Sequence, residues 1–396
     1  MSADRQLFFS HIAQTSPSPI GLEIIKAQGN YQYDINGKKY FDLIAGFSVA
    51  NIGHSNPAVI NAIKKQAEVY MHVIVYGEFI QSPQTQYAQL LTNHLPASLN
   101  CIYFTNSGAE ATEGALKLAK RSTNRTNIIA FHKSYHGSTQ GALSLMGDEY
   151  YRNAFRPLLP GVYHFHYNSD GVLNAINEET ACVILETVQA ESGVAAPRKN
   201  WLKALREKCN EQGALLIFDE IQAGFGRTGS LWAFEQFDVV PDILLLGKAL
   251  GGGMPLGAFI ADKKLMQKIS FNPVLGHITT FGGHPVSCAA GKAAFEILLS
   301  ENYIKDVADK ERMFVEKLKH PSIKRVNHFG LWMSLQFEST EIAQKIIHAC
   351  IKNGLITDWF LFAPDCLRIV PPLTITKDEI DKVCAAILKS IDEVIK

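Results

Sequence analysis

The sequence predicts an α/β protein in which helices cover a mostly parallel sheet. From about residue 57 onward, short aliphatic runs alternate with helical patterns, and this alternation is typical of repeated strand–helix–strand units. The runs lack the polar alternation of half-exposed strands, so both faces of the sheet should be buried. We expect strands at CIYFT (101–105), NIIAFH (127–132), ACVILET (181–187), ALLIFDE (214–220) and DILLLGK (242–248).

A second, smaller α+β domain is predicted from both ends of the chain. The segment GNYQYDINGKKYFDL (29–43) holds two alternating runs around Asn36-Gly37, which is a hairpin signal. After about residue 290, helical stretches surround the short runs LWMSLQF and CLRIVPPL. We therefore expect a large domain at 55–290 and a small domain formed by 1–54 and 291–396.

The charge balance and the cysteines exclude several classes of protein. Among 396 residues, 38 Lys and Arg balance 38 Asp and Glu, so nothing steers the chain toward nucleic acid or an acidic membrane. The sequence has no apolar run of membrane-spanning length, and its first residues do not resemble a secretory signal. Seven cysteines without a CxxC motif favour reduced thiols and no metal site. We expect a cytoplasmic protein.

Side chains that could bind a ligand follow two of the expected strands. CIYFT is followed by Ser107, a good helix N-cap, and the next amides could face a phosphate. NIIAFH is followed by Tyr135, which could stack on a flat ring. Taken alone, each also fits a purely structural role, a capped helix or a core aromatic.

An acid and a lysine end two further strands. Asp219 follows ALLIF and Lys248 follows DILLLG, and the interval suits a crossover between neighbouring strands. A buried carboxylate needs a positive partner. A lysine after three leucines would lose its proton readily and act as a nucleophile, although a lysine at a strand end is more often simply solvated.

One cofactor would account for all four strand ends, pyridoxal 5′-phosphate. It needs an amine for a Schiff base, an acid at the pyridine nitrogen, a phosphate cradle and a ring partner. The dinucleotide pattern formed by Gly224, Gly226 and Gly229 is a weaker alternative. It follows its strand too late for a tight turn, and the next strand ends in a lysine where a ribose-binding acid is needed.

Six motifs then carry a resemblance to the class III aminotransferases, which include ornithine, acetylornithine and 4-aminobutyrate aminotransferases. In chain order they are NSGAEATEGALKLAK, FHKSYHG, ETVQAESG, LLIFDEIQAGFGRTG, LLLGKALGGGMPLGA and TTFGGHPVSCAAG. The likeness covers nearly the whole chain. It implies fold type I with a seven-stranded type of sheet, pyridoxal phosphate, and ping-pong transfer of an amino group to a 2-oxo acid.

The resemblance also implies roles around the cofactor ring. Lys248 would form the Schiff base, and Asp219 would bind the pyridinium nitrogen. Gln222 would approach the phenolic oxygen. Tyr135 and Ile221 would cover the two faces of the ring.

The same resemblance divides the phosphate site between two subunits. Ser107, Gly108 and Ala109 would hold the phosphate from one subunit. Thr280, in TTFGGHP, would reach the phosphate of the partner subunit. A homodimer with a shared active site would then be the smallest working unit.

Two residues resemble the family's substrate switch. Arg368, in LRIVPPL, would grip the α-carboxylate of glutamate or 2-oxoglutarate, which suits a guanidinium that makes two hydrogen bonds. Glu191, in QAESG, would pair with Arg368 while the other substrate is bound. The alternatives are a structural ion pair for Arg368 and a solvated loop acid for Glu191.

The chain departs from the family pattern where the donor should bind. Ser138 stands where these enzymes usually carry an arginine after HG, so a second carboxylate clamp is missing and the donor stays open. Tyr76 and Glu78 would line the donor pocket, and Glu78 could meet a distal ammonium as in ornithine. Trp359 and Phe360 would line the same pocket or pack the small domain.

Three rival functions fit the sequence less well. An aminomutase or an amino-acid racemase would share the cofactor and the fold, but the pair formed by Glu191 and Arg368 favours two alternating substrates. A nicotinamide-dependent oxidoreductase is disfavoured by the glycine spacing. A non-catalytic scaffold is disfavoured because Lys248, Asp219, Gln222 and Thr280 are all present.

Overall fold

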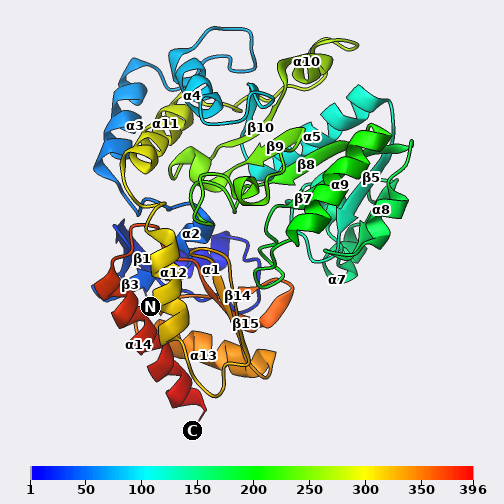
Figure 1. Cartoon of the computed structure of the whole chain (residues 1–396). Coiled ribbons are helices and arrows are strands. Elements are labelled where there is room, and N and C mark those ends of the chain that lie inside the picture. The colour runs from blue at the N-terminus through cyan, green and yellow to red at the C-terminus, as the bar shows by residue number, and fades with distance from the viewer. Residues whose placement is uncertain (1, 396) are drawn as a thin grey trace.

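The computed structural model describes residues 2–395, and its centre is a seven-stranded sheet (Figure 1). All neighbouring strands run parallel except β10, which is antiparallel to both of its neighbours. The expected mostly parallel sheet is therefore confirmed, and β10 and β6 are strands that the sequence analysis missed. In spatial order the strands are β4 (Cys101–Thr105), β10 (Gly257–Ala261), β9 (Ile243–Leu246), β8 (Leu215–Asp219), β7 (Thr180–Glu186), β5 (Asn127–Phe131) and β6 (Val162–Phe165).

Helices cover both faces of this sheet, as the aliphatic strands require. In β8, Leu216 and Phe218 join the apolar cluster of α9 (Lys199–Gln212), whereas Ile217 joins that of α5 (Gly108–Thr123). Side chains alternate across a strand, so α9 and α5 lie on opposite faces. The central strands β7, β8 and β9 are consequently buried on both sides, which leaves their carboxyl ends to bind a ligand.

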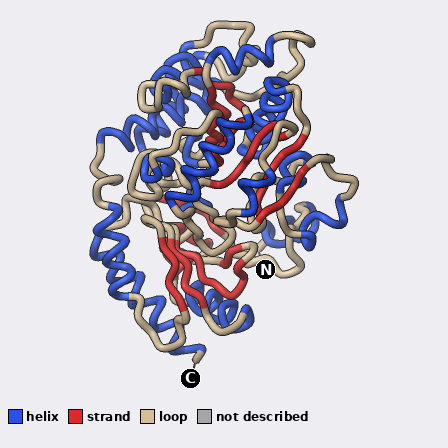
Figure 2. Tube along the Cα trace, turned by 45° about the vertical axis from the view of Figure 1, so that its right-hand side comes forward, coloured by secondary structure: helices blue, strands red, loops and turns tan. Residues whose placement is uncertain are grey.

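Two four-stranded sheets lie below the large sheet in Figure 1, and Figure 2 shows these strands as a separate group. In one of them, β3 pairs parallel with β13, so the N-terminal segment and the last third of the chain share a sheet. The expected hairpin around Gly37 joins β2 to β3. The strands are β1 (Ile24–Gln28), β2 (Tyr31–Asp34), β3 (Lys39–Asp42) and β13 (Leu355–Ile356), and then β11 (Arg325–His328), β12 (Met333–Gln336), β15 (Ala363–Ile369) and β14 (Trp359–Phe360).

The long helix α11 (Pro285–Ser300) crosses the expected domain boundary at residue 290. It packs on α3 (Pro57–Val69) and α4 (Ser82–Thr92), beside the large sheet (Figure 1). We keep the division into 1–54, 55–290 and 291–396 as a proposal. The other helices are α1 (Ala3–His11), α2 (Ala45–Ser48), α6 (Gln140–Leu145), α7 (Glu149–Arg152), α8 (Gly171–Ala175), α10 (Lys263–Met266), α12 (Val307–Lys317), α13 (Thr340–Lys352) and α14 (Lys377–Val394). Short 3₁₀ turns occupy Asn153–Phe155, Ala233–Phe237, Lys248–Gly251 and Gln267–Ser270.

None of the helices within 2–395 combines the length and the apolar character that crossing a lipid bilayer requires.

Candidate active site

A cavity of about 550 Å³ opens where β4, β5, β7, β8 and β9 end. Ligands of parallel sheets bind at this edge, outside the carboxyl ends of the strands. Most of the site residues expected from the sequence line this one cavity: Ser107, Gly108, Ala109, Tyr135, Glu191, Asp219, Ile221, Gln222 and Lys248.

Lys248 is the nucleophile candidate, and it begins a 3₁₀ turn that Gly247 alone separates from β9. Its backbone has a φ of 49°, a conformation uncommon for residues other than glycine. The Nζ atom lies 3.5 Å from Gln222 Oε1. Burial lowers the pKa of Lys248 below its usual value, although the carboxylates of Asp219 and Glu191 oppose this effect. A lysine with a lowered pKa holds a free amine more often, as nucleophilic catalysis requires.

Asp219, the last residue of β8, is buried and has two partners within the chain. Its Oδ2 lies 2.7 Å from His136 Nδ1, and its Oδ1 accepts a hydrogen bond of 2.9 Å from the backbone N–H of Ile221. The sequence analysis missed His136, although it stands in the quoted motif FHKSYHG. Within the described chain, the buried Nε2 of His136 has no hydrogen-bond partner. The histidine therefore orients Asp219 and adds to the polar end of the cavity.

The start of α5 fits an anion. Ser107 caps the helix by accepting a hydrogen bond from the N–H of Glu110 at 3.2 Å, and Gly108 and Ala109 follow in the first turn. Unpaired amides and the helix dipole attract negative charge at this end. A Cβ atom added at Gly108 would lie 2.6 Å from Ile221 Cδ1, so only glycine allows Ile221 this close. A phosphate at the amides and a flat ring against Ile221 both fit this arrangement.

Tyr135 forms another wall of the cavity and is positioned by an acid that the sequence analysis missed. Its backbone N–H donates to Glu186 Oε1 at 3.0 Å, and its hydroxyl lies 3.1 Å from Ser138 Oγ. Glu186 also accepts a hydrogen bond of 2.9 Å from the N–H of Ala190. Burial raises the pKa of Glu186 to about 7. Glu186 thus joins the aromatic wall to the loop that carries Glu191.

Arg368, on β15, is fully buried and reaches the cavity through Glu191. Its Nη1 and Nη2 donate to the two oxygens of Glu191, each at 2.8 Å. Burial works to raise the pKa of Glu191, but the charge and hydrogen bonds of Arg368 outweigh it and hold this pKa below its usual value. The side chain of Asp358 also contacts the guanidinium, with Oδ1 2.8 Å from Nε. The sequence analysis did not single out Asp358, which lies in the short connection between β13 and β14.

Besides Arg368, other residues expected near the substrate or the cofactor lie outside this cavity, among them the buried Phe360. Thr280 and Glu78 are exposed on the surface of the chain. Tyr76 lines a separate hollow of about 210 Å³ beside Phe104 of β4. Trp359 is 39% exposed, and its carbonyl oxygen accepts a hydrogen bond from Arg368 Nη2 at 2.7 Å.

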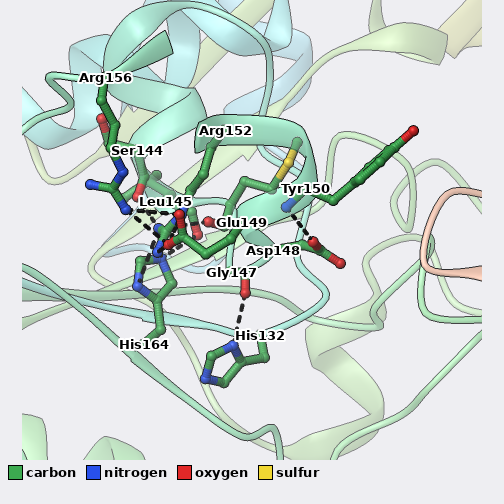
Figure 3. Close-up of polar contacts among 11 residues, drawn as sticks. His132, Ser144, Leu145, Gly147, Asp148, Glu149, Tyr150, Arg152, Arg156 and His164 are labelled. Atoms are coloured by element: carbon green, nitrogen blue, oxygen red, sulfur yellow. Dashed lines mark hydrogen bonds and ion pairs between the residues drawn. The ribbon is translucent and has the colours of Figure 1, made fainter. Parts of the chain in front are cut away.

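A polar cluster supports the segment that leads from α6 to the next turn, and Figure 3 shows its side chains. Arg152 donates to the carbonyl oxygen of Met146 at 2.9 Å and to Glu149, which also binds Arg156. The neighbouring hydroxyl of Tyr151 donates to the carbonyl oxygen of Leu361 at 3.0 Å. This segment therefore braces the loop beside Glu191, because the N–H of Leu361 also donates to Glu191 Oε2 at 2.8 Å.

The chemistry of the cavity fits pyridoxal phosphate better than a metal ion. An amine, an acid, an aromatic wall and a helix start converge on it. Among residues 2–395, no group of three or more His, Cys, Asp or Glu side chains is arranged to hold a metal ion.

Comparisons with known proteins agree with this chemistry. Residues 12–391 match the family described as aminotransferase class-III. The chain is 39% identical to the acetylornithine aminotransferase of Bacillus subtilis over 93% of its length and 95% of that protein. It is also 39% identical to the acetylornithine aminotransferase of Methanopyrus kandleri, over 96% of each chain. The ornithine aminotransferase of Toxoplasma gondii superposes with a TM-score of 0.91 at 29% identity, over 98% of this chain and 93% of that one.

These matches extend along nearly the whole chain, as the six motifs indicated. They exclude the nicotinamide-dependent alternative, and they set transamination above the racemase, aminomutase and scaffold alternatives. The chain belongs to the class III aminotransferases, and it is a pyridoxal 5′-phosphate-dependent transaminase of fold type I.

Proposed function

We propose that this enzyme moves an amino group from an amino acid or an ω-amine to 2-oxoglutarate by a ping-pong mechanism. The observation that carries the proposal is the ion pair between Arg368 and Glu191 at the wall of the Lys248 cavity. A guanidinium paired with a movable carboxylate can exchange that carboxylate for one on the substrate. One cavity could then serve two substrates in turn.

The cofactor's neighbours would be the residues that line the cavity. When bound, pyridoxal phosphate supplies an aldehyde that accepts the amino group and a ring that takes up an electron pair. Lys248 would hold the cofactor and move a proton from the amine-bearing carbon of the donor, acting first as base and then as acid. Asp219, oriented by His136, would keep a proton on the ring nitrogen. Gln222, which contacts Lys248, would bind the phenolic oxygen.

The remaining contacts would hold the two ends of the cofactor. Ser107, Gly108 and Ala109 would bind the phosphate at the start of α5. Tyr135 and Ile221 would enclose the ring, which the close packing of Ile221 on Gly108 supports.

The donor would carry a neutral or cationic distal end. Lys248 is the one lysine or arginine among the residues that line the cavity, and the position where the family usually carries an arginine is Ser138. The carboxylates of Glu186, Glu191 and Asp219 line the same space. A donor with a second carboxylate at Ser138 would meet no cation there. A diamine, whose distal end is an ammonium, fits this charge pattern best, whereas acetylornithine, after which the curated relatives are named, carries a carboxylate distal to its ω-amine.

A homodimer would complete the site. The exposed flank, which we define as residues 69–81 and 271–281, brings two segments together through the rings of His72 and Phe281 at 4.9 Å. Large apolar side chains are exposed across it, which is typical of an interface. They are Val69, Met71, Ile74, Phe79, Ile80, Phe271, Val274, Leu275, Ile278 and Phe281.

Thr280 and Glu78 belong to the exposed flank, as does the half-buried Tyr76, which lines the hollow beside Phe104. In a dimer, Thr280 would bind the phosphate held by the partner subunit, and Tyr76 and Glu78 would border the partner's donor. We also place the enzyme in the cytoplasm, which the seven free cysteines support.

A half-reaction assay tests the proposed function. The loaded enzyme with an amine donor alone should release one equivalent of oxo product per site, and 2-oxoglutarate added afterwards should give one equivalent of glutamate. Lys248→Ala should lower turnover on the order of 10⁴-fold, because it removes both base and nucleophile. Lys345→Ala, which changes a lysine of a surface ion pair on α13, is the control. Release of oxo product only when both substrates are present would contradict a ping-pong mechanism.

A further inference from the structure

Arg368 contacts two carboxylates, although a substrate switch needs only one. Glu191 takes both terminal nitrogens of the guanidinium at 2.8 Å. Asp358 Oδ1 lies 2.8 Å from the third nitrogen, Nε. Within residues 2–395, neither Asp358 Oδ1 nor Arg368 Nε has a hydrogen-bond partner, so the contact between them is an ion pair rather than a directed hydrogen bond. The two acids therefore hold different edges of the same cation.

A backbone hydrogen bond fixes each acid, since the carbonyl oxygen of Glu191 accepts one from the N–H of Phe362 at 2.9 Å, but the two acids differ in their access to the cavity. Glu191 lies in a loop and lines the cavity. Asp358 is tied to Arg368 itself, because the backbone N–H of Arg368 donates to the carbonyl oxygen of Asp358 at 2.9 Å. Asp358 does not line the cavity. A substrate can consequently displace the side chain of Glu191 without disturbing Asp358.

We propose that Asp358 is a positioning residue that keeps Arg368 aimed at the cavity while the carboxylate of the 2-oxo acid takes the place of Glu191. This inference rests on the proposed function of Arg368 as the carboxylate-binding residue. Asp358 would be the permanent counter-ion of Arg368, and Glu191 the exchangeable one.

Contacts that remain after Glu191 leaves support this division. Arg368 Nη2 still donates to the carbonyl oxygen of Trp359 at 2.7 Å. The guanidinium carbon lies 4.2 Å from the ring centre of Phe360 and 5.3 Å from that of Phe47. These contacts restrain the plane of the guanidinium, but they supply no negative charge. Asp358 is the acid that would still balance the buried cation.

The charges around Asp358 agree with a lasting role. Burial raises the pKa of Asp358 to about 6, because the attraction of Arg368 only partly offsets burial and the repulsion of Glu191 and Asp42 adds to it. A substrate carboxylate that replaces Glu191 brings the same charge to the same edge of Arg368. The charge around Asp358 thus stays constant through both half-reactions, and no step of the exchange leaves Arg368 without a counter-ion.

The test is Asp358→Asn, which keeps the shape and removes the charge. The KM for 2-oxoglutarate in the second half-reaction should rise roughly tenfold, the size of one contact with a charged group. The rate of the first half-reaction with a simple amine, which has no carboxylate for Arg368, should change less than about twofold on the same grounds. An equal loss in both half-reactions would show a merely structural role and overturn the proposal.

A pH profile adds a readout that damage to the fold would not produce. In the unchanged enzyme, the KM for 2-oxoglutarate should rise as the pH falls through about 6, because Asp358 then takes up a proton and its charge is lost. In Asp358→Asn this rise should be absent. Persistence of the same rise in the variant would contradict the assignment.

Two further variants separate this inference from the proposed function. Asp365→Asn changes an acid of the same strand, β15, which binds Gln336 and not Arg368, and it should leave the KM unchanged. Arg368→Lys should raise the KM for 2-oxoglutarate even where Asp358→Asn does not. If Arg368→Lys has no effect, the proposed function of Arg368 fails. If only Asp358→Asn has no effect, the inference fails alone.

Discussion

The cavity at the end of the large sheet and the exposed flank differ in what one chain can complete. At the cavity, side chains from the ends of five strands converge, and Lys248, Asp219 and Gln222 line one space. On the exposed flank, Thr280 and Glu78 point to solvent. Both regions carry residues of the family motifs, yet only those at the cavity are brought together within one chain.

The difference follows from sheet topology. The carboxyl ends of parallel strands lie at the same edge of a sheet. Residues that follow different strands therefore lie close together there, whatever the conformations of the loops. The exposed flank has no such scaffold, and Ile80 is 96% exposed there. A site residue on a loop is therefore placed by what the loop docks against, which for this flank would be a second copy.

The largest expected effect lies on the cavity side of the comparison. Asp219→Asn removes the charge that would hold a proton on the cofactor's ring nitrogen, and it weakens the contact with His136. We expect kcat to fall on the order of 10³-fold, the cost of losing a group that stabilises developing charge. Steady-state kinetics with saturating cofactor measure the loss.

Asp309→Asn, which changes an exposed acid on α12, is the matched control. An Asp219→Asn enzyme with near-normal kcat would show that the cavity does not need this carboxylate. It would contradict the claim that the residues at the strand ends carry the catalytic function.

The second prediction concerns the exposed flank. Ile80→Glu places a charge on the most exposed apolar residue of this flank and should weaken the dimer on the order of 100-fold, because an apolar contact is lost and a charge must be desolvated. Analytical ultracentrifugation across a concentration series measures the dissociation constant. Activity should fall together with the fraction of dimer, since Thr280 would then no longer reach the partner's cofactor.

Val240→Glu changes an apolar residue of similar type that is 38% exposed away from the exposed flank. It should leave assembly and activity unchanged. A fully active Ile80→Glu monomer would show that the active site is complete in one chain. The exposed flank would then contribute nothing to the site.

The fold was predictable where a local pattern of apolar residues or a single turn motif identifies the element. The five aliphatic runs predicted five parallel strands, and the hairpin signal around Gly37 marked the turn between β2 and β3. β10 was missed because GAFIA follows the glycine-rich stretch after Lys248 and carries no strand–helix pattern of its own. The small domain's sheets join distant segments, such as β3 and β13, and no local pattern encodes that pairing.

The site was predictable where residues follow strands, and less so where they position others. His136, Glu186 and Asp358 act through contacts with residues distant in sequence, so their types alone did not mark them. His136 could have been noticed, since it lies in a quoted motif beside Tyr135. Asp358 had no signal except its place before Trp359 and ten residues ahead of Arg368, and only the pairing of the two backbones brings them together.

The smallest expected effect also concerns the cavity. It tests a residue that supports the cavity wall, not one that takes part in the reaction. Tyr151→Phe deletes the hydrogen bond to the carbonyl oxygen of Leu361 and keeps the ring packed on Phe362. The cost should be about 1 kcal/mol, and the KM for 2-oxoglutarate should fall about threefold to fivefold, because Leu361 also holds Glu191 in the ion pair that the substrate must displace. Tyr150→Phe is the matched control, since the neighbouring Tyr150 is 86% exposed and should tolerate the same change. Equal KM values for the two variants would contradict this role, because they would mean that the loop at Leu361 keeps its place and continues to hold Glu191 without Tyr151.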